Sequence, residues 1–283
     1  MKFSYACYQL KLRSGGIRIG AILRIPFADG SYGHADCHPW VEFGDLILEE
    51  QLNALKRDQL TLLLQRSLHY AKLEAKARKK GVSLFKDLSL PKSHLQINLG
   101  DSSSYPLLKL KLKPHQVEQF FDWADNRVLW RLDFNSSFTS EECEQFLKKA
   151  KHFNIDFIED PFPYNASEWH RQQKQYDVAF AEDFEEGSEA QVIICKPAVR
   201  EILQTKKRRI VTTYIDHPIG QLSALYTAAI DPDLQKEPGG FFTHTLYEPN
   251  AFIDRLKIDQ DRLLPPIGIG WGYDQELEQL EWR

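Results

Sequence analysis

The sequence predicts a modified TIM-type (β/α)7β barrel preceded by a small α+β capping domain. From about residue 96 onward, strand-like segments alternate with helical ones, which is typical of a parallel sheet. Several of these strand-like segments end in charged residues, and the carboxyl ends of barrel strands are where TIM-type proteins carry their sites. The number of β-α units favours closure into a barrel over an open sheet.

Composition restricts the classes of function. The chain has 283 residues, of which 42% are hydrophobic, enough for one large barrel and an additional domain. A net charge of -4 gives no basic excess, so we expect no binding to nucleic acid or to a membrane. The polar N-terminus, the lack of an apolar run near ~20 residues and the four scattered cysteines favour a cytoplasmic protein. Nothing specifies an oligomer, and a monomer is compatible with the sequence.

The first 95 residues predict strands followed by helices. Residues 3–12 and 17–25 alternate in hydrophobicity around a Ser14-Gly15-Gly16 turn, which predicts a hairpin or meander. Residues 46–80 carry leucines and alanines three and four positions apart, which predicts helices. We therefore expect residues 1–95 to form the cap, residues 96–264 the barrel with its active site, and residues 265–283 a segment that packs back on the cap.

The barrel elements follow in order. Pro114 opens a helix, a position where its missing N–H costs nothing. A strand then ends at Asn135, and Thr139 with Glu142 forms a capping box for the next helix. The following strand ends at Glu159.

The second half of the barrel is less regular. Only 14 residues separate Glu182 from Lys196, too few for a helical crossover of the usual size, so one outer helix is expected to be truncated. Residues 210–214 predict a further strand, and residues 221–230 a short helix.

Charged side chains gather at the predicted strand ends. In an extended strand alternate residues share a face, so Arg131, Asp133 and Asn135 point one way. Asp133, Glu159 and one acid of the Glu182/Asp183 pair make an all-oxygen set suited to a hard divalent cation. Mg²⁺ is the natural choice, and Mn²⁺ is compatible with the same ligands.

Two lysines flank these acids in the sequence, Lys111 before them and Lys196 after them. A metal ion and a lysine base together can remove a weakly acidic proton beside a carboxylate, so a small-molecule carboxylate is the expected substrate. Salt bridges that line a structural barrel are the alternative explanation. Barrel interiors are normally filled with Val, Ile and Leu, so clustered charge favours a functional site over structural salt bridges.

These motifs, in this order, resemble the o-succinylbenzoate synthase family of the enolase superfamily over roughly residues 15 to 275. The family's K-x-K, D-x-N, E-x-P and K-P strands are matched by Lys109-Leu110-Lys111, Asp133-Phe134-Asn135, Glu159-Asp160-Pro161 and Lys196-Pro197. Arg131 resembles the R-L-D-x-N form of the family, and Thr212-Thr213 lies where the family has a hydroxyl-rich substrate strand.

The resemblance implies a Mg²⁺-dependent lyase of menaquinone biosynthesis. It would dehydrate 2-succinyl-6-hydroxy-2,4-cyclohexadiene-1-carboxylate to o-succinylbenzoate through an enediolate. Lys111 is implied as the base that returns its proton to the leaving hydroxyl, and Lys196 as the second catalytic lysine. The implied metal ligands are Asp133, Glu159 and Glu182 or Asp183, and the implied substrate contacts are Lys109, Arg131, Asn135, Thr212 and Thr213.

The chain departs from the family pattern where the usual D-E-S is replaced by Ala181-Glu182-Asp183. We prefer Glu182 as the third ligand, with Asp183 as the alternative. Lys109, Lys111 and Lys113 share one face, and the family register favours Lys111 as the base. An N-acylamino acid racemase, a dipeptide epimerase or a cycloisomerase would fit the same scaffold, and a non-catalytic ligand-binding barrel is an alternative of another class.

Overall fold

The computed structural model describes residues 2–183, 187–202 and 204–283, and the chain forms two compact units. The first unit comprises Met1–Lys92, Lys196–Ile202 and Val211–Arg283, and the second comprises Ser93–Cys195 and Leu203–Ile210. The predicted division into residues 1–95, 96–264 and 265–283 stays a prediction.

The first unit contains an antiparallel sheet in the order β1-β2-β3. Its strands are β1 (Ser4–Lys11), β2 (Ile17–Pro26) and β3 (Tyr32–Cys37). Gly15 and Gly16 have positive φ in the turn between β1 and β2, a conformation that glycine adopts without steric cost. The predicted hairpin is confirmed.

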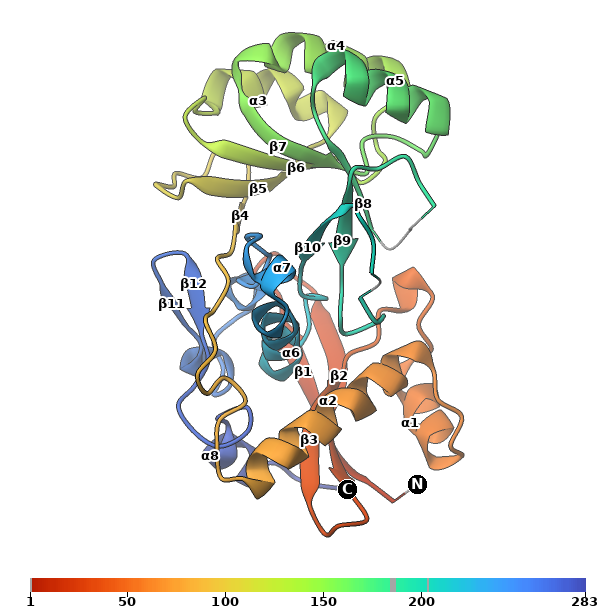
Figure 1. Ribbon diagram of the computed structural model, residues 1–283, viewed down its shortest axis with the longest axis vertical. Coiled ribbons are helices and arrows are strands. Elements are labelled where there is room, and N and C mark those ends of the chain that lie inside the picture. Colours follow the sequence, from red (N-terminus) through yellow and green to blue (C-terminus); the bar gives the residue numbers. More distant parts are fainter. Residues whose placement is uncertain (1, 184–186, 203) are drawn as a thin grey trace. The chain divides into compact units, whose positions relative to one another are not determined.

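Helix α2 (Leu62–Lys79) lies across this sheet in Figure 1 and packs directly on β3. A Cβ added at Gly33 would lie 1.9 Å from the backbone oxygen of Ala71, so the strand approaches the helix too closely for any side chain. The Thr61 hydroxyl caps α2 by accepting a hydrogen bond from the N–H of Leu64 at 3.2 Å. The helical pattern of residues 46–80 is thus confirmed, divided into α2 and a shorter helix α1 (Leu48–Lys56).

The rest of the first unit is built from short elements. Apart from α1 and α2, the longest helix of this unit is α6 (Pro218–Ile230), which includes the predicted helix over residues 221–230. The C-terminal segment returns to the antiparallel sheet, where Trp271 Nε1 donates to the backbone oxygen of His34 at 2.9 Å. The remaining elements are η1 (Val41–Phe43), α7 (Pro232–Gln235), η4 (Thr243–Leu246), η5 (Ile253–Arg255), β11 (Lys257–Asp259), β12 (Arg262–Leu264) and α8 (Asp274–Glu278).

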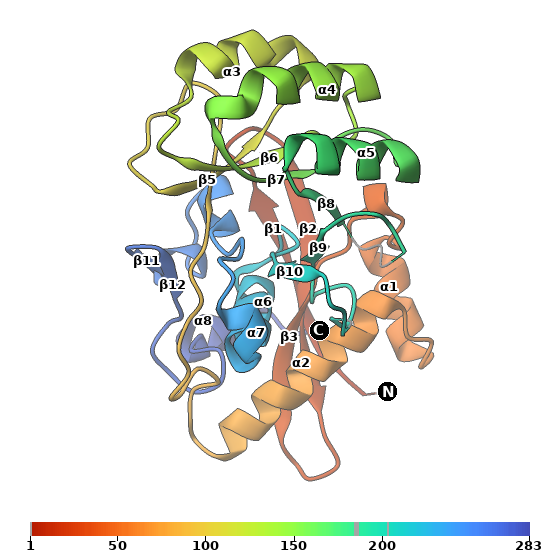
Figure 2. The same ribbon diagram turned by 45° about the horizontal axis from the view of Figure 1, so that its top comes forward.

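The second unit is a parallel half-barrel built on a sheet in the order β10-β9-β8-β7-β6-β5-β4. Its strands are β4 (Leu95–Ile97), β5 (Leu107–Lys111), β6 (Leu129–Asp133), β7 (Asn154–Glu159), β8 (Phe180–Asp183), β9 (Val192–Cys195) and β10 (Arg208–Val211), whose last residue belongs to the first unit. The helical segments are η2 (Pro114–Gln116), α3 (Val117–Trp123), α4 (Ser140–Lys149), η3 (Ala150–His152) and α5 (Ala166–Tyr176). Helices α3, α4 and α5 lie on one face of the sheet (Figure 2). No described helix of the chain is both long and apolar enough to cross a membrane.

The two faces of this sheet carry different side chains. The face toward the helices holds large apolar residues, among them Leu110, Leu132, Ile158 and Phe180, packed against Phe120, Phe146 and Trp169. The opposite face has a smaller apolar cluster of Phe157, Ala181, Val192, Ile194 and Ile210. Burial of the helix-facing residues fixes the strand register, because a one-residue slip would turn every one of them to the other face.

Local sequence signals in the second unit are largely confirmed. The capping box has both of its hydrogen bonds, from Glu142 N to the Thr139 hydroxyl at 3.1 Å and from Thr139 N to the Glu142 carboxylate at 2.8 Å. Among the described residues between β8 and β9, no helix is present. The strand predicted over residues 210–214 is shifted and ends at Val211, because Thr212 bridges Gly240 and Ile215 takes a positive φ.

A buried ion-pair network joins three strands of the half-barrel. Arg131 on β6 is fully buried, and its Nε lies 2.7 Å from Asp156 Oδ2 on β7. Arg208 at the start of β10 lies 2.6 Å from the other oxygen of the same carboxylate. The Arg131 guanidinium also lies over the Phe157 ring, 4.9 Å from its centroid. Asp156 therefore neutralises two arginines, one of them without contact to solvent.

We expect Asp156→Asn to destabilise the protein by about 3 kcal/mol, because it leaves a buried guanidinium without its counter-charge. Urea unfolding measures the change. Asp125→Asn is the matched control, since the Asp125–Arg127 pair is exposed and should leave the unfolding midpoint unchanged. Equal midpoints for the two variants would contradict a structural role for this network.

Candidate active site

The site is built on the charged face of the half-barrel, at the carboxyl ends of its strands. In the ladder, Lys111 is the partner of Asp133, Asp133 of Glu159, and Glu159 of Ala181. Partners in a parallel sheet project side chains to the same face, so these positions form one row across β5 to β8. The row contains the predicted base and two of the predicted metal ligands, with Ala181 at its end.

Lys109 lies two residues before this row and reaches into it. Its Nζ is 2.6 Å from Glu159 Oε2 and 3.0 Å from Asp133 Oδ2, and its side chain is 11% exposed. Burial would lower the pKa of Lys109, but the Asp133 and Glu159 carboxylates outweigh burial and raise it. Lys109 is therefore held as an ammonium group between two carboxylates.

Lys111 has a different environment on the same strand. Its Nζ lies 3.5 Å from Asp133 Oδ2, and its side chain is 48% exposed. Burial alone would raise the pKa of Asp133, yet the charges of Lys109 and Lys111 bring it below its usual value. The backbone N–H of Asn135 also donates to Asp133 Oδ1 at 3.1 Å. Asp133 is thus a carboxylate that orients both lysines.

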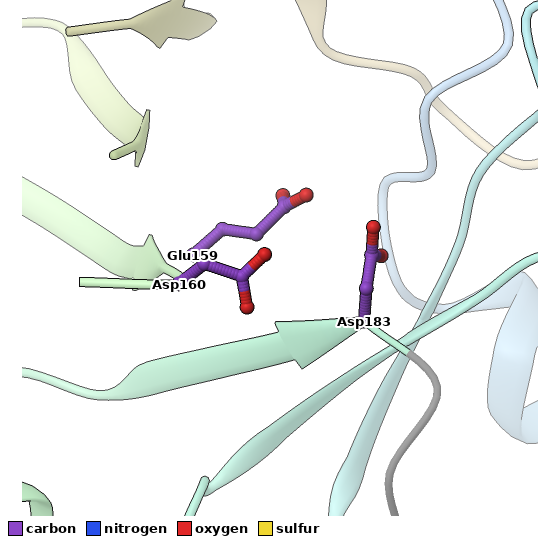
Figure 3. A group of neighbouring side chains, drawn as sticks. All are labelled: Glu159, Asp160 and Asp183. Carbon is purple, nitrogen blue, oxygen red and sulfur yellow. The ribbon is translucent and has the colours of Figure 1, made fainter. Parts of the chain in front are cut away.

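Three carboxylates come together at the ends of β7 and β8. One oxygen from each of Glu159, Asp160 and Asp183 lies within 4.8 Å of the others, and Figure 3 shows the three side chains facing a common space. Asp160 joins the group where the chain leaves β7 with a positive φ. Three carboxylates are the donor set that a hard divalent cation prefers, so this group is able to hold a metal ion.

Asp160 was not among the predicted ligands. The E-D-P motif put it beside Glu159, but strict alternation along a strand assigns neighbouring residues to opposite faces. The positive φ at Asp160 ends that alternation. Aspartate adopts this conformation more readily than most residues, but its presence in the motif is too weak a signal to predict it.

The register of β8 separates the two alternatives for the third ligand. Ala181 is in the cluster on the charged face and Phe180 is in the cluster under the helices. By alternation, Asp183 shares the face of Ala181 and Glu182 shares that of Phe180. Glu182 is 9% exposed. The preference for Glu182 stays a prediction, and the strand geometry favours Asp183.

The other predicted site residues are distributed over both units. Arg131 takes part in the buried network with Asp156, and Asn135 is exposed beyond the end of β6 with φ of 45°. Lys196, Thr212 and Thr213 belong to the first unit. Lys196 is half-buried, and the Thr213 hydroxyl is 2.7 Å from the hydroxyl of Thr243. Their roles toward a substrate stay predictions.

Comparison with known proteins gives matches in sequence and in fold. Residues 5–77 match the family model described as O-succinylbenzoate synthase, N-terminal domain. A protein of Bdellovibrio bacteriovorus described as o-succinylbenzoate synthase is 29% identical over an alignment of 323 positions, which covers 100% of this chain and 98% of the relative. The first part of the chain thus resembles the N-terminal domain of o-succinylbenzoate synthases, and the whole chain is similar to a protein described by that name.

Solved structures share the fold of this chain. The muconate lactonizing enzyme of Pseudomonas putida has a TM-score of 0.71 at 14% identity, with 99% of this chain and 98% of that one covered. A dipeptide epimerase of Cytophaga hutchinsonii, complexed with Mg and a dipeptide, has a TM-score of 0.73 at 14% identity over 99% and 98% of the two chains. At this level of identity the likeness concerns the fold, which is the predicted one.

We expect Mg²⁺ to raise the melting temperature, because a cation that binds the folded state alone adds about 2.7 kcal/mol at 100 times its Kd. The shift, measured against a chelator, should be lost in Asp183→Asn and kept in Glu182→Gln. The reverse ranking would show that Glu182 is the ligand. Equal melting temperatures of the wild type with Mg²⁺ and with chelator would contradict the proposed metal site.

Proposed function

We propose that this enzyme dehydrates 2-succinyl-6-hydroxy-2,4-cyclohexadiene-1-carboxylate to o-succinylbenzoate and water, a step of menaquinone biosynthesis. The full-length similarity to an o-succinylbenzoate synthase supports this substrate. In the reaction the C–H bond next to the carboxylate and the C–O bond of the ring hydroxyl break on the same face. The electron pair of the C–H bond completes the aromatic ring, and the proton leaves with the hydroxyl as water.

The contrast between the two lysines of β5 carries the assignment of the base. A base for this reaction must be reachable by substrate and must not be committed to other partners. Lys109 is buried and contacts two carboxylates, whereas Lys111 has half of its side chain exposed and one longer contact to Asp133. Lys111 therefore takes the proton and delivers it to the leaving hydroxyl, and Lys109 positions Asp133 and Glu159.

The carboxylates beside Lys111 fit a divalent cation, for which we propose Mg²⁺, with Mn²⁺ as a substitute. A bound Mg²⁺ would supply positive charge to the substrate carboxylate, which makes the neighbouring C–H bond more acidic. Glu159, Asp160 and Asp183, which lie together, would hold this ion. We propose Asp133, the ladder partner of Glu159, as a further ligand. Mg is present in the complex of the dipeptide epimerase of the same fold, which supports the choice.

Lys196 is proposed as a second cation that favours the anionic intermediate without taking a proton. This role follows from the stereochemistry of a syn elimination, in which a single group can act as base and then as acid. We propose that five further residues bind or orient the substrate, namely Lys109, Arg131, Asn135, Thr212 and Thr213. Because Arg131 is buried against Asp156, its proposed contribution is indirect and acts through the neighbouring strand β7.

Replacement of the two lysines should give unequal results. Lys111→Ala should lower kcat at least about 100-fold, the smaller end of what general acid-base catalysis contributes. Lys196→Arg keeps the positive charge and should retain a measurable fraction of turnover. The assay follows loss of the cyclohexadiene absorbance with Mg²⁺ present, and Lys113→Ala, an exposed lysine two residues after Lys111, is the matched control.

The same preparations should be tested for exchange of the α-proton of N-acylamino acids and dipeptides in heavy water. A racemase or epimerase needs each lysine to exchange a proton on its own face, so both lysine variants would fail alike. Proton exchange by the wild type without dehydration would contradict the proposed synthase activity and would support a racemase or epimerase. Metal binding without turnover of any of these substrates would favour a non-catalytic barrel.

A further inference from the structure

The first unit contains two carboxylates that face one another, and neither belongs to the half-barrel. Asp36 lies on β3, and Asp216 lies two residues before α6. Asp216 is 1% exposed, and Asp36 is partly exposed to solvent. Both line a cavity of about 10 Å³, which has room for about one water molecule.

The backbone at Gly220 brings the two side chains together. A Cβ added there would lie 2.5 Å from Asp216 Oδ2 and 2.6 Å from Asp36 Oδ2, so both oxygens approach the same point in the first turn of α6. Any other residue at this position would separate the carboxylates or displace the helix. Two like charges at such a position in the protein interior would repel strongly.

The hydrogen-bond donors around the pair are distributed unequally. Asp36 Oδ1 accepts from the Tyr8 hydroxyl at 2.6 Å, and Asp36 Oδ2 accepts from the backbone N–H of His217 at 3.0 Å. Among the described residues, no donor meets hydrogen-bond geometry at either oxygen of Asp216, and the backbone N–H groups of Asp216 and Tyr214 affect its pKa less than burial does. Asp36 is thus equipped to be a carboxylate, and Asp216 has the environment of a neutral carboxyl.

In the part of the chain that the structure describes, the groups that face the pair carry no compensating positive charge. His38 Nδ1 contacts the Tyr8 hydroxyl at 2.8 Å, and burial lowers the pKa of His38 to about 3 and that of His217 well below its usual value. Tyr8, Tyr70, Tyr247 and Cys37 also face the pair, and burial raises the pKa of each, so they stay neutral. The nearby arginines are engaged elsewhere, Arg18 with Glu42 at 2.8 Å and Arg66 with the Pro197 carbonyl at 2.9 Å and the Tyr70 hydroxyl at 3.1 Å.

We propose that Asp36 and Asp216 form an acid pair that retains one shared proton in the folded protein at neutral pH, with Asp216 as the carboxyl and Asp36 as the carboxylate. The proton joins β3 to the start of α6 by a hydrogen bond between the two acids. The pair is independent of the proposed dehydration and makes the stability of the first unit depend on pH.

The direction of this dependence follows from the two folded pKa values. Burial, assisted by the charge of Asp36, holds the pKa of Asp216 well above its usual range, and burial raises that of Asp36 to about 7. In the unfolded chain both titrate near ~3.9. The folded state therefore binds more protons above pH ~4, so the contribution of the pair is complete at low pH and is lost as pH rises through the folded values.

The test compares Asp216→Asn with the wild type by urea unfolding between pH 6 and 8. An asparagine side chain replaces the neutral carboxyl, donates an N–H to Asp36 and does not titrate. The ratio of the folding constants, variant over wild type, should rise by about tenfold per pH unit, the linkage expected for one proton. Asp259→Asn on the exposed strand β11 is the matched control, and its ratio should not change with pH.

A second measurement does not depend on the variant being folded. Infrared spectra of the wild type at pH 8 in heavy water should contain the carbonyl band of a protonated carboxyl group. A flat ratio for Asp216→Asn, or the absence of that band, would overturn the proposal. So would a stabilisation of the wild type at pH 8 by Na⁺ or K⁺ relative to choline at equal ionic strength, because a bound cation would then take the place of the proton.

Discussion

The two-residue period of the strands in the half-barrel is the constraint on which its other features depend. Leu132 on β6 and Phe180 on β8 are buried beneath the helices. The residues directly before and after each of them in its strand therefore point to the opposite face. That face receives Lys109, Lys111, Asp133 and Glu159 in adjacent positions. The apolar layer under α3, α4 and α5 thus fixes the places of the charged groups on the other face of the sheet.

Placing charges on a largely buried face has a cost, and the second unit offsets it by pairing. Lys109 lies between Asp133 and Glu159, and Asp156 lies between Arg131 and Arg208. Each of these lysine, aspartate, glutamate and arginine side chains thus has an opposite charge within 3.0 Å, the condition under which buried ions are tolerated. A divalent cation that binds Asp133 and Glu159 would share these carboxylates with Lys109, so metal binding and the position of this lysine are linked.

In the first unit, two carboxyl groups are compensated by a proton and not by a basic side chain. Among the described residues, no lysine or arginine pairs with Asp36 or Asp216, and burial keeps the neighbouring histidines neutral. A proton is the smallest charge that can compensate such a pair, and the cavity beside it has room for about one water molecule. Burial without a cation favours proton retention, whereas burial with one favours the ionised form that Asp133 adopts.

The sequence by itself determined the class of fold, the strand and helix order and the row of Lys111, Asp133 and Glu159, because periodicity and capping signals are local. The capping box at Thr139 and the hairpin at Gly15 are of this kind. Only the tertiary structure decided what depends on turns and on neighbours distant in sequence. The left-handed turn brings Asp160 to Glu159, the ladder from Glu159 to Ala181 places Asp183 rather than Glu182 on the charged face, and helix α6 brings Asp216 to Asp36. These contacts arise from packing between elements, which no spacing along the chain records.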